Sequence, residues 1–181
     1  MDLEQLGLIL RRIRKEPLHT PSEEASKSSF VPLGRAEIER LLPHRNAMLL
    51  IESIESVDRA RRTICGTMRL REDDPVLAGH FPGDPIYPGV LLVEAMGQLG
   101  LCLIQLTEQD HAAFDGRALP KLRATRIHHA AFFEPVTPGA SASLQTAVVE
   151  DSGLTIIAAG QVYHRGRLCA VSIHEVYIGN E

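Results

Sequence analysis

The longest apolar stretch of the chain spans residues 90–107, where Glu94 is the only charged residue. A bilayer-spanning helix needs ~20 predominantly apolar residues, and Glu94, Gln98 and Gln105 interrupt this stretch. A helix that is apolar on all sides inside a water-soluble protein is instead a buried one. The pattern therefore predicts a core helix that extends to about residue 106, and no membrane span.

Segments rich in Val, Ile and Tyr lie on both sides of this helix in the sequence and are typical of strands in a half-buried sheet. We predict strands at residues 47–57, 61–71, 119–132, 140–150, 154–164 and 167–178, and a short helix at residues 36–42 that ends before Pro43. Turn residues separate neighbouring strands at Asp58-Arg59-Ala60, Asp151-Ser152-Gly153 and Arg165-Gly166. These elements predict an α+β fold in which an antiparallel sheet wraps around the long central helix.

One sheet covers only one side of an apolar helix, so a second copy of the chain is needed to cover the other side. This reasoning favours a homodimer in which the same surface of each subunit forms the contact. The length of 181 residues suits a single domain, which we assign to residues 31–181.

Residues 1–30 form an N-terminal extension with a composition of its own. Four apolar residues share one helical face and four basic residues gather at its end, namely Leu3, Leu6, Leu10 and Ile13, and then Arg11, Arg12, Arg14 and Lys15. Residues 20–29 are polar and serine-rich, as in a linker. A fraying tail is the simpler interpretation and a docked amphipathic helix is the alternative. The acidic residues Asp2, Glu4 and Glu16 argue against a mitochondrial transit peptide.

Charge and cysteine content narrow the functional class. The formal net charge of −4 and the pI of about 6.1 give no electrostatic reason to expect nucleic acid as a partner. Cys65, Cys102 and Cys169 are odd in number, far apart and set in apolar segments, so we expect buried thiols in a reducing compartment. No secretory signal is visible at the N-terminus, which also favours a cytoplasmic protein.

The candidate chemistry is carried by the segment before the long helix, residues 79–89. It contains His80 within a turn of three prolines and three glycines, and Glu94 follows fourteen residues after His80. Proline fixes φ and glycine permits positive φ, so such a segment holds one irregular backbone path. An imidazole and a carboxylate held near free backbone N–H groups are suited to general acid–base catalysis.

This segment resembles the signature of the β-hydroxyacyl-acyl-carrier-protein dehydratases of the FabZ type, which have the hot-dog fold. Two further landmarks of that family stand in order around it, Leu42-Pro43-His44-Arg45 with Leu49-Leu50-Ile51 upstream, and Phe132, Pro135-Val136 and Pro138-Gly139 downstream. The resemblance extends over about residues 38–178 and leaves only the N-terminal segment uncovered. It implies an enzyme of fatty-acid or related lipid or polyketide synthesis that dehydrates (3R)-3-hydroxyacyl thioesters.

Removal of water from such a thioester needs a base, an acid and donors for the charge that develops on the thioester oxygen. His80 suits the base, because imidazole titrates near neutral pH. Glu94 suits the acid, because burial disfavours the charged form of a carboxyl group. The N–H of Gly89 is among the first amides of the helix, which lack intrahelical partners, and would polarise the carbonyl. A lone histidine or a lone buried glutamate is more often structural, so the assignment depends on the pair.

Other polar residues nearby have two interpretations each. Gln98 lies one helical turn after Glu94 and could bind the carboxylate or a water molecule, or be a polar residue at a subunit boundary. Tyr87 could line the acyl pocket or be part of the core. His44 and Arg45 are expected to tie the loop together and not to act chemically.

Metal and cofactor chemistry finds no support in the sequence. The adjacent His128 and His129 lie on a predicted strand and would point to opposite faces, so they would not bind one metal ion. No metal-ligand cluster, phosphate loop or serine-elbow motif is present, and we expect neither a metal nor a cofactor.

The resemblance also implies a substrate class and partners. Glu94 stands where the related FabA-type dehydratase–isomerases have aspartate, which favours trans-2-enoyl formation without isomerisation. Family members place the histidine of one subunit against the glutamate of its partner, and by this resemblance we expect the dimers to form a trimer of dimers. Their substrates are carried by an acidic acyl carrier protein. In family members, basic residues near the position of Phe132 usually contact this carrier. This chain has His129-Ala130-Ala131-Phe132-Phe133-Glu134-Pro135 there, so the carrier patch is predicted to be shifted or weaker.

Alternatives remain open from the sequence. Other basic candidates for carrier contact are Lys121, Arg123, Arg126, Arg165 and Arg167. A coenzyme A thioester is the alternative to a carrier-borne substrate. A hot-dog acyl-thioesterase and a catalytically silent subunit that pairs with an active one are the alternatives to a dehydratase.

Overall fold

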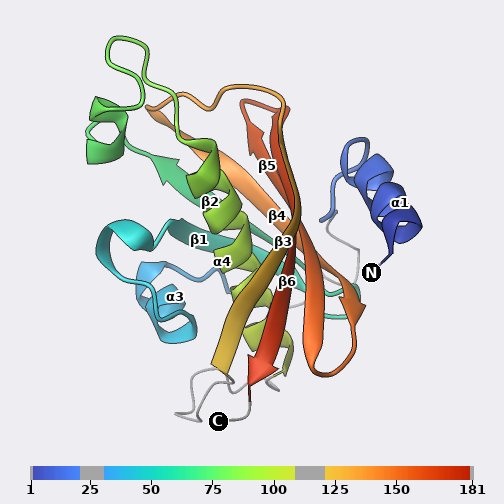
Figure 1. Cartoon of the computed structure of the whole chain (residues 1–181). Helices are drawn as coiled ribbons and strands as arrows, with labels where there is room; N and C mark the ends of the chain where they lie inside the picture. The colour runs from blue at the N-terminus through green and yellow to red at the C-terminus, as the bar shows by residue number, and fades with distance from the viewer. Residues whose placement is uncertain (1, 21–30, 109–120, 180–181) are drawn as a thin grey trace.

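The computed structural model describes residues 2–20, 31–108 and 121–179, and its main feature is an antiparallel sheet curved against a long helix (Figure 1). The six strands are β1 (Ile51–Asp58), β2 (Thr63–Leu70), β3 (Lys121–Phe132), β4 (Ala140–Asp151), β5 (Thr155–His164) and β6 (Arg167–Gly179). Their order in the sheet is β1-β2-β4-β5-β6-β3, so β3 is an edge strand although it lies in the middle of the sequence. The predicted α+β fold is confirmed.

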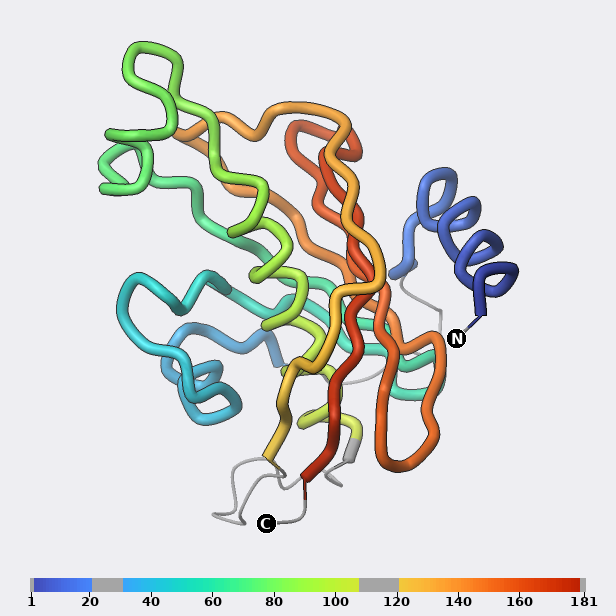
Figure 2. The backbone as a smooth tube through the Cα atoms, viewed as in Figure 1, coloured from blue at the N-terminus to red at the C-terminus, as the bar shows by residue number. Residues whose placement is uncertain are grey.

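The helices are α1 (Leu3–Ile13), α3 (Arg35–Leu41) and α4 (Gly89–Glu108), with the 3-10 turns η1 (Asn46–Met48) and η2 (Pro75–Ala78). The strand predicted from residue 47 begins only at Ile51, because Asn46 adopts a positive φ of 55° and starts η1. Of the strand predicted from residue 119, the first two residues lie outside the described part of the chain. The backbone tube shows η1 and η2 at the same side of the molecule as α3 and the start of α4 (Figure 2).

The core lies between α4 and the inner face of the sheet. Leu99 and Leu103 of α4 are completely buried. The helix comes closest to the sheet at Gly160, where a Cβ atom would lie 2.7 Å from the Cβ of Met96. The apolar window of α4 is long enough to cross a bilayer, but 67% of it is buried inside the protein. It is therefore the predicted core helix.

One stripe of α4 is left without a full cover by the described residues. Val90, Glu94, Gly97 and Leu101 follow one another at helical spacing and are exposed or half-buried. The adjoining side of the edge strand β3 presents Phe132, whose ring contacts Gly89. Val90 is 72% exposed and Phe132 is 53% exposed. An apolar stripe that contains one carboxylate therefore lies beside an edge strand that is paired on one side only.

Helix α1 covers the opposite face of the sheet (Figure 1). An aspartate capping box at Asp2 and Gln5 begins the helix, and Ile13 near its end is 1% exposed. Ile13 belongs to a small cluster with residues of β5 and β6, namely Ile157, Ala159, Val171 and Ile173. The N-terminal extension thus contains a helix that packs on the sheet, while residues 21–30, where the linker was predicted, lie outside the described residues.

Candidate active site

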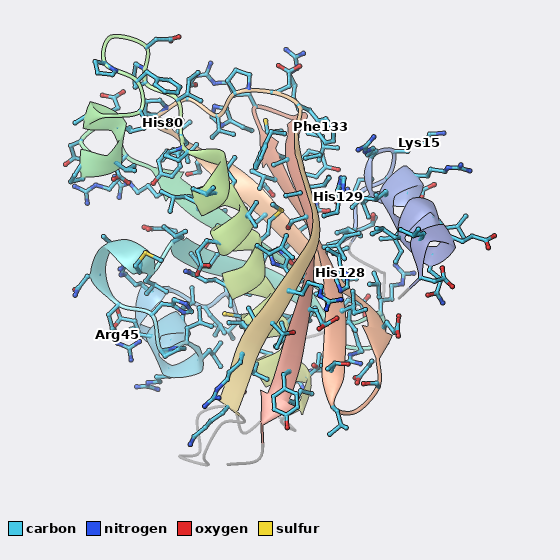
Figure 3. The ribbon with its side chains drawn as sticks, in the orientation of Figure 1. Lys15, Arg45, His80, His128, His129 and Phe133 are labelled. Atoms are coloured by element: carbon cyan, nitrogen blue, oxygen red, sulfur yellow. The ribbon has the colours of Figure 1, made fainter. Side chains whose placement is uncertain are left out.

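His80 lies in the irregular loop between η2 and α4, at the N-terminal end of the long helix (Figure 3). Its Nδ1 is 2.9 Å from the carbonyl oxygen of Ile86. Because a carbonyl oxygen only accepts, Nδ1 carries the proton in this contact and Nε2 of the neutral ring keeps a free lone pair. The ring also stacks on Phe81 with 4.1 Å between centroids. The loop therefore presents an oriented imidazole whose Nε2 is a base.

The loop itself is held by backbone contacts. The amide of Ile86 donates to the carbonyl of His80 at 3.1 Å, and the amide of Tyr87 donates to the carbonyl of Val136 at 2.7 Å. These bonds tie both ends of the turn, so its path does not depend on its proline and glycine content alone. Backbone order of this kind is needed to hold a catalytic group in place.

Glu94 is held by Gln98, as one of the two sequence interpretations expected. Gln98 donates through Nε2 to Glu94 Oε1 at 2.8 Å and to the carbonyl of Met48 at 2.7 Å, and its Oε1 accepts from the amide of Leu50 at 3.0 Å. Both amide protons and the amide oxygen of Gln98 are thus satisfied, and the residue is 1% exposed. The carboxylate is fixed from the side by a residue that has little freedom to move.

Two histidines lie next to Glu94 in the same chain, and the sequence analysis predicted this position for neither of them. His44 Nε2 is 3.3 Å from Glu94 Oε1. His174 of β6 is buried, its Nε2 lies 2.6 Å from Ser172 Oγ, and its ring approaches Gly97 of α4. Burial lowers the pKa of His174 to about 4, although the nearby Glu94 charge opposes this shift. The sequence did contain one signal for the burial of His174, because this residue stands between apolar residues of a predicted strand.

The Glu94 side chain keeps 38% of its surface exposed in the single chain. The burial that the sequence predicted for this carboxyl group is therefore incomplete. The reason is its position in the open stripe of α4, which no described residue of the same chain covers fully.

Gly89 begins α4, and no described residue accepts a hydrogen bond from its N–H. A Cβ atom at this position would lie 2.7 Å from the Phe132 ring. Glycine is therefore required by the approach of Phe132, a reason that the sequence did not reveal. The amide stays available as a donor at a helix N-terminus, where the helix dipole adds positive potential.

Tyr87 is 4% exposed, and its hydroxyl donates to Asp74 Oδ2 at 2.6 Å. Burial, together with this hydrogen bond, raises the pKa of the phenol. The residue also lines a cavity of about 650 Å³ together with Leu49 and Leu50. Tyr87 is thus held in place by Asp74 and also forms part of the wall of a cavity.

Among the described residues, no group of three or more His, Cys, Asp or Glu side chains could hold a metal ion. The predicted alternation of His128 and His129 is interrupted, because the pairing of β3 with β6 shifts between Ile127 and His129. His128 Nε2 lies 2.9 Å from Glu175 Oε2. All three cysteines are free thiols. Cys102 and Cys169 are buried, as predicted, whereas the prediction is wrong for Cys65, which is half-buried.

In the single chain the structure brings together Glu94, Gln98, His44 and His174, whereas His80 is held in a separate loop.

Comparisons with known proteins bear on this arrangement. A family model described as "FabA-like domain" matches residues 42–172. The chain is 33% identical over 136 residues to the 3-hydroxyacyl-[acyl-carrier-protein] dehydratase FabZ of Campylobacter curvus, covering 74% of this chain and 89% of the relative. It is 35% identical over 137 residues to the enzyme of the same name from Campylobacter jejuni strain 81-176, again covering 74% and 89%.

Solved structures share the fold. The dehydratase heterocomplex ApeI:P from Xenorhabdus doucetiae superposes with a TM-score of 0.64 at 18% identity, over 84% of this chain and 93% of that chain. A protein described as a thioesterase from Ralstonia eutropha superposes with a TM-score of 0.53 at 13% identity, over 69% and 83%. Helix α1 precedes the region that the family model matches.

Proposed function

From the premise that this chain belongs to the FabA-like dehydratase family, we propose that it removes water from (3R)-3-hydroxyacyl thioesters on acyl carrier protein in fatty-acid or related lipid synthesis. The observation that carries the proposal is the oriented imidazole of His80, together with a carboxylate at Glu94 that Gln98 holds in place. The free cysteines agree with a cytoplasmic enzyme. Glutamate at position 94 supports a trans-2-enoyl product without isomerisation.

The residues divide the reaction between them. His80 Nε2 takes the proton from the carbon next to the thioester carbonyl, and the Gly89 N–H stabilises the negative charge that develops on the carbonyl oxygen. Protonated Glu94 gives its proton to the departing hydroxyl, which leaves as water while the carbon–carbon double bond forms. The enzyme is left with an imidazolium and a carboxylate, and the return of one proton from His80 to Glu94 restores the starting state.

The site is proposed to be complete only in a homodimer. In the single chain Glu94 lies in the exposed stripe of α4, and its described side-chain contacts do not include His80. A second subunit that covers this stripe would bring its own His80 loop to Glu94 and would bury Val90. The edge strand β3, twelve residues long, offers the backbone groups for a continuous sheet across the dimer.

The decisive test uses purified protein with a 3-hydroxybutyryl or crotonyl thioester. Ultraviolet absorbance follows the conjugated enoyl thioester, and a thiol reagent in the same sample detects hydrolysis. We expect an absorbance change without thiol release. Thiol release would establish a thioesterase, and neither signal would establish a silent subunit.

The His80→Ala variant tests the proposed base. Removal of a general base typically costs ~100- to 10,000-fold in rate, so the variant should lose most activity while it remains folded. His19→Ala is the matched control, because the His19 ring contacts Thr63 Oγ1 and Ser56 Oγ and none of the proposed site residues, so the folded variant should keep its rate within about twofold. A folded His80→Ala protein with activity near that of this control would refute the mechanism.

A further inference from the structure

The end of helix α1 is fastened to the outer face of the sheet by one buried side chain. Gln161 of β5, which is 0% exposed, donates through Nε2 to the carbonyls of Ile13 at 2.6 Å and Glu16 at 2.8 Å. Its Oε1 accepts from the amide of Leu18 at 2.7 Å. These three bonds fix the turn that follows α1, because they use every donor and acceptor of the Gln161 amide.

The fixed turn carries exposed positive charge. Arg11, Arg14 and Lys15 are exposed, and no carboxylate among the described residues forms an ion pair with them. Arg12 is close to Glu16, at 3.8 Å, with both side chains largely exposed. The cations at this end of α1 therefore remain available to an anionic partner.

This basic end lies beside the downstream end of β3, as the positions of Lys15, His129 and Phe133 show in Figure 3. The Arg14 guanidinium lies 5.4 Å above the ring centroid of Phe133. Burial, with a smaller effect of the Arg14 charge, lowers the pKa of His129. Phe132, the residue before Phe133, contacts Gly89 at the start of α4. At this end of β3, Phe133 thus lies under the basic end of α1, and its neighbour Phe132 lies against the start of α4 on the other face of the sheet.

Three of the other basic candidates are less well placed. Arg167 pairs with Glu134. Lys121 and Arg123 lie at the upstream end of the twelve-residue strand β3, roughly 30–36 Å from Phe132 at the usual rise per residue. At the Phe132 end the strand itself has Ala130 and Ala131 and therefore adds no positive charge there.

We infer that the C-terminal end of α1, through Arg14 and Lys15, is the docking surface for the acidic acyl carrier protein that delivers the substrate. The inference rests on the proposed function, since it names the partner of the same active site. It also gives a role to an element that precedes the family-matched region. The acyl arm of a carrier docked there would reach the active site past Phe133 and Phe132.

The test compares two double charge reversals in the full-length protein. Arg14→Glu with Lys15→Glu alters the proposed surface, and Arg59→Glu with Arg61→Glu, at exposed positions in the turn between β1 and β2, is the control with the same change of net charge. Each protein is assayed with a 3-hydroxyacyl carrier substrate, the matching coenzyme A thioester and the matching N-acetylcysteamine thioester. At low ionic strength the Arg14/Lys15 variant should show about a tenfold higher KM for the carrier substrate only, and added salt should reduce the difference from wild type.

The outcomes separate this inference from the proposed function. No dehydration of the N-acetylcysteamine thioester by the wild-type protein would overturn the proposed function itself. Normal dehydration with an equal KM for the carrier substrate in both variants would overturn the carrier surface alone. An equal loss with coenzyme A would assign the cations to a nucleotide phosphate. Unchanged carrier kinetics with loss of binding to vesicles of anionic phospholipid would assign them to a membrane surface.

Discussion

At the scale of single residues, the site is organised by Gln98. This amide binds the Glu94 carboxylate and the backbone on both sides of Leu49, so it connects α4 to the segment before β1. His80 has an equivalent support in the carbonyl of Ile86. Each proposed catalytic group is therefore oriented by a neighbour that has no chemical task of its own.

Replacement of Glu94 by Gln should separate the chemistry from the structure. The new amide oxygen can still accept from Gln98, so the melting temperature should stay within a few degrees of wild type. The variant lacks a transferable proton, and its rate should fall by ~100- to 10,000-fold. Enoyl absorbance and thermal unfolding, measured on the same preparation, check both parts. A rate close to that of wild type would exclude Glu94 as the acid.

His174 should make stability depend on pH. Its pKa is about 4 in the folded protein against 6.5 as the ordinary value, so the unfolded chain binds a proton first as the pH falls. The contribution is complete above pH 6.5 and is lost between pH 6.5 and 4, by about 3 kcal/mol at most. Urea unfolding at several pH values should show this loss in wild type and a smaller one in His174→Gln. Parallel curves for the two proteins would contradict the assignment.

At the scale of elements, α1 follows the amphipathic pattern of its sequence and gains its position from the sheet. Its buried residue Ile13 packs in the outer cluster, whereas Leu8 on the same helix is 60% exposed. Substitutions at Ile13 and Leu8 therefore compare a buried with an exposed apolar residue of the same helix.

Ile13→Ala should lower the free energy of unfolding by ~2–4 kcal/mol, because a buried large-to-small change removes apolar contacts and leaves a cavity. Leu8→Ala, the matched control, should change it by less than ~0.5 kcal/mol. Denaturant unfolding of the two variants measures both values. Equal values for the two variants would show that α1 is not part of the cooperative folding unit.

At the scale of the whole molecule, the open stripe of α4 lies beside the edge strand β3. A single partner surface would therefore cover both. Ile127 of β3 is 57% exposed, and it adds to the apolar surface that a second subunit would bury. A dimer that covers this surface would also enclose Glu94.

Hybrid dimers should recover activity from two inactive proteins. If His80 of one subunit acts with Glu94 of the partner subunit, a mixture of His80→Ala and Glu94→Ala proteins contains dimers with one intact site. After subunit exchange we expect up to about a quarter of the wild-type rate, since half of the dimers are hybrids with one site of two. Native mass measurement confirms the exchange and reports whether the dimers form a trimer of dimers. Proven exchange without recovered activity would exclude a shared site.

The amino-acid pattern was enough to predict most of the elements and to select the candidate site residues. The apolar run predicted α4, the strand segments and turns predicted the sheet, and the proline–glycine turn singled out His80 with Glu94. These features follow from local conformational preference and from hydrophobic periodicity, which depend on residues that are neighbours in the chain. The early start given to β1 failed because the positive φ at Asn46 is not encoded by a glycine or proline.

The contacts between residues that are far apart in the sequence became apparent only from the folded structure. His44 and His174 lie beside Glu94, and Phe132 contacts Gly89, through the packing of α4 on the loop before β1 and on strands β6 and β3. The docking of α1 and the place of its cations at one end of β3 likewise depend on contacts between residues more than one hundred positions apart, such as Leu18 with Gln161. Hydrophobic periodicity specifies which face of an element is buried, but not which partner covers it, because many apolar faces satisfy the same pattern.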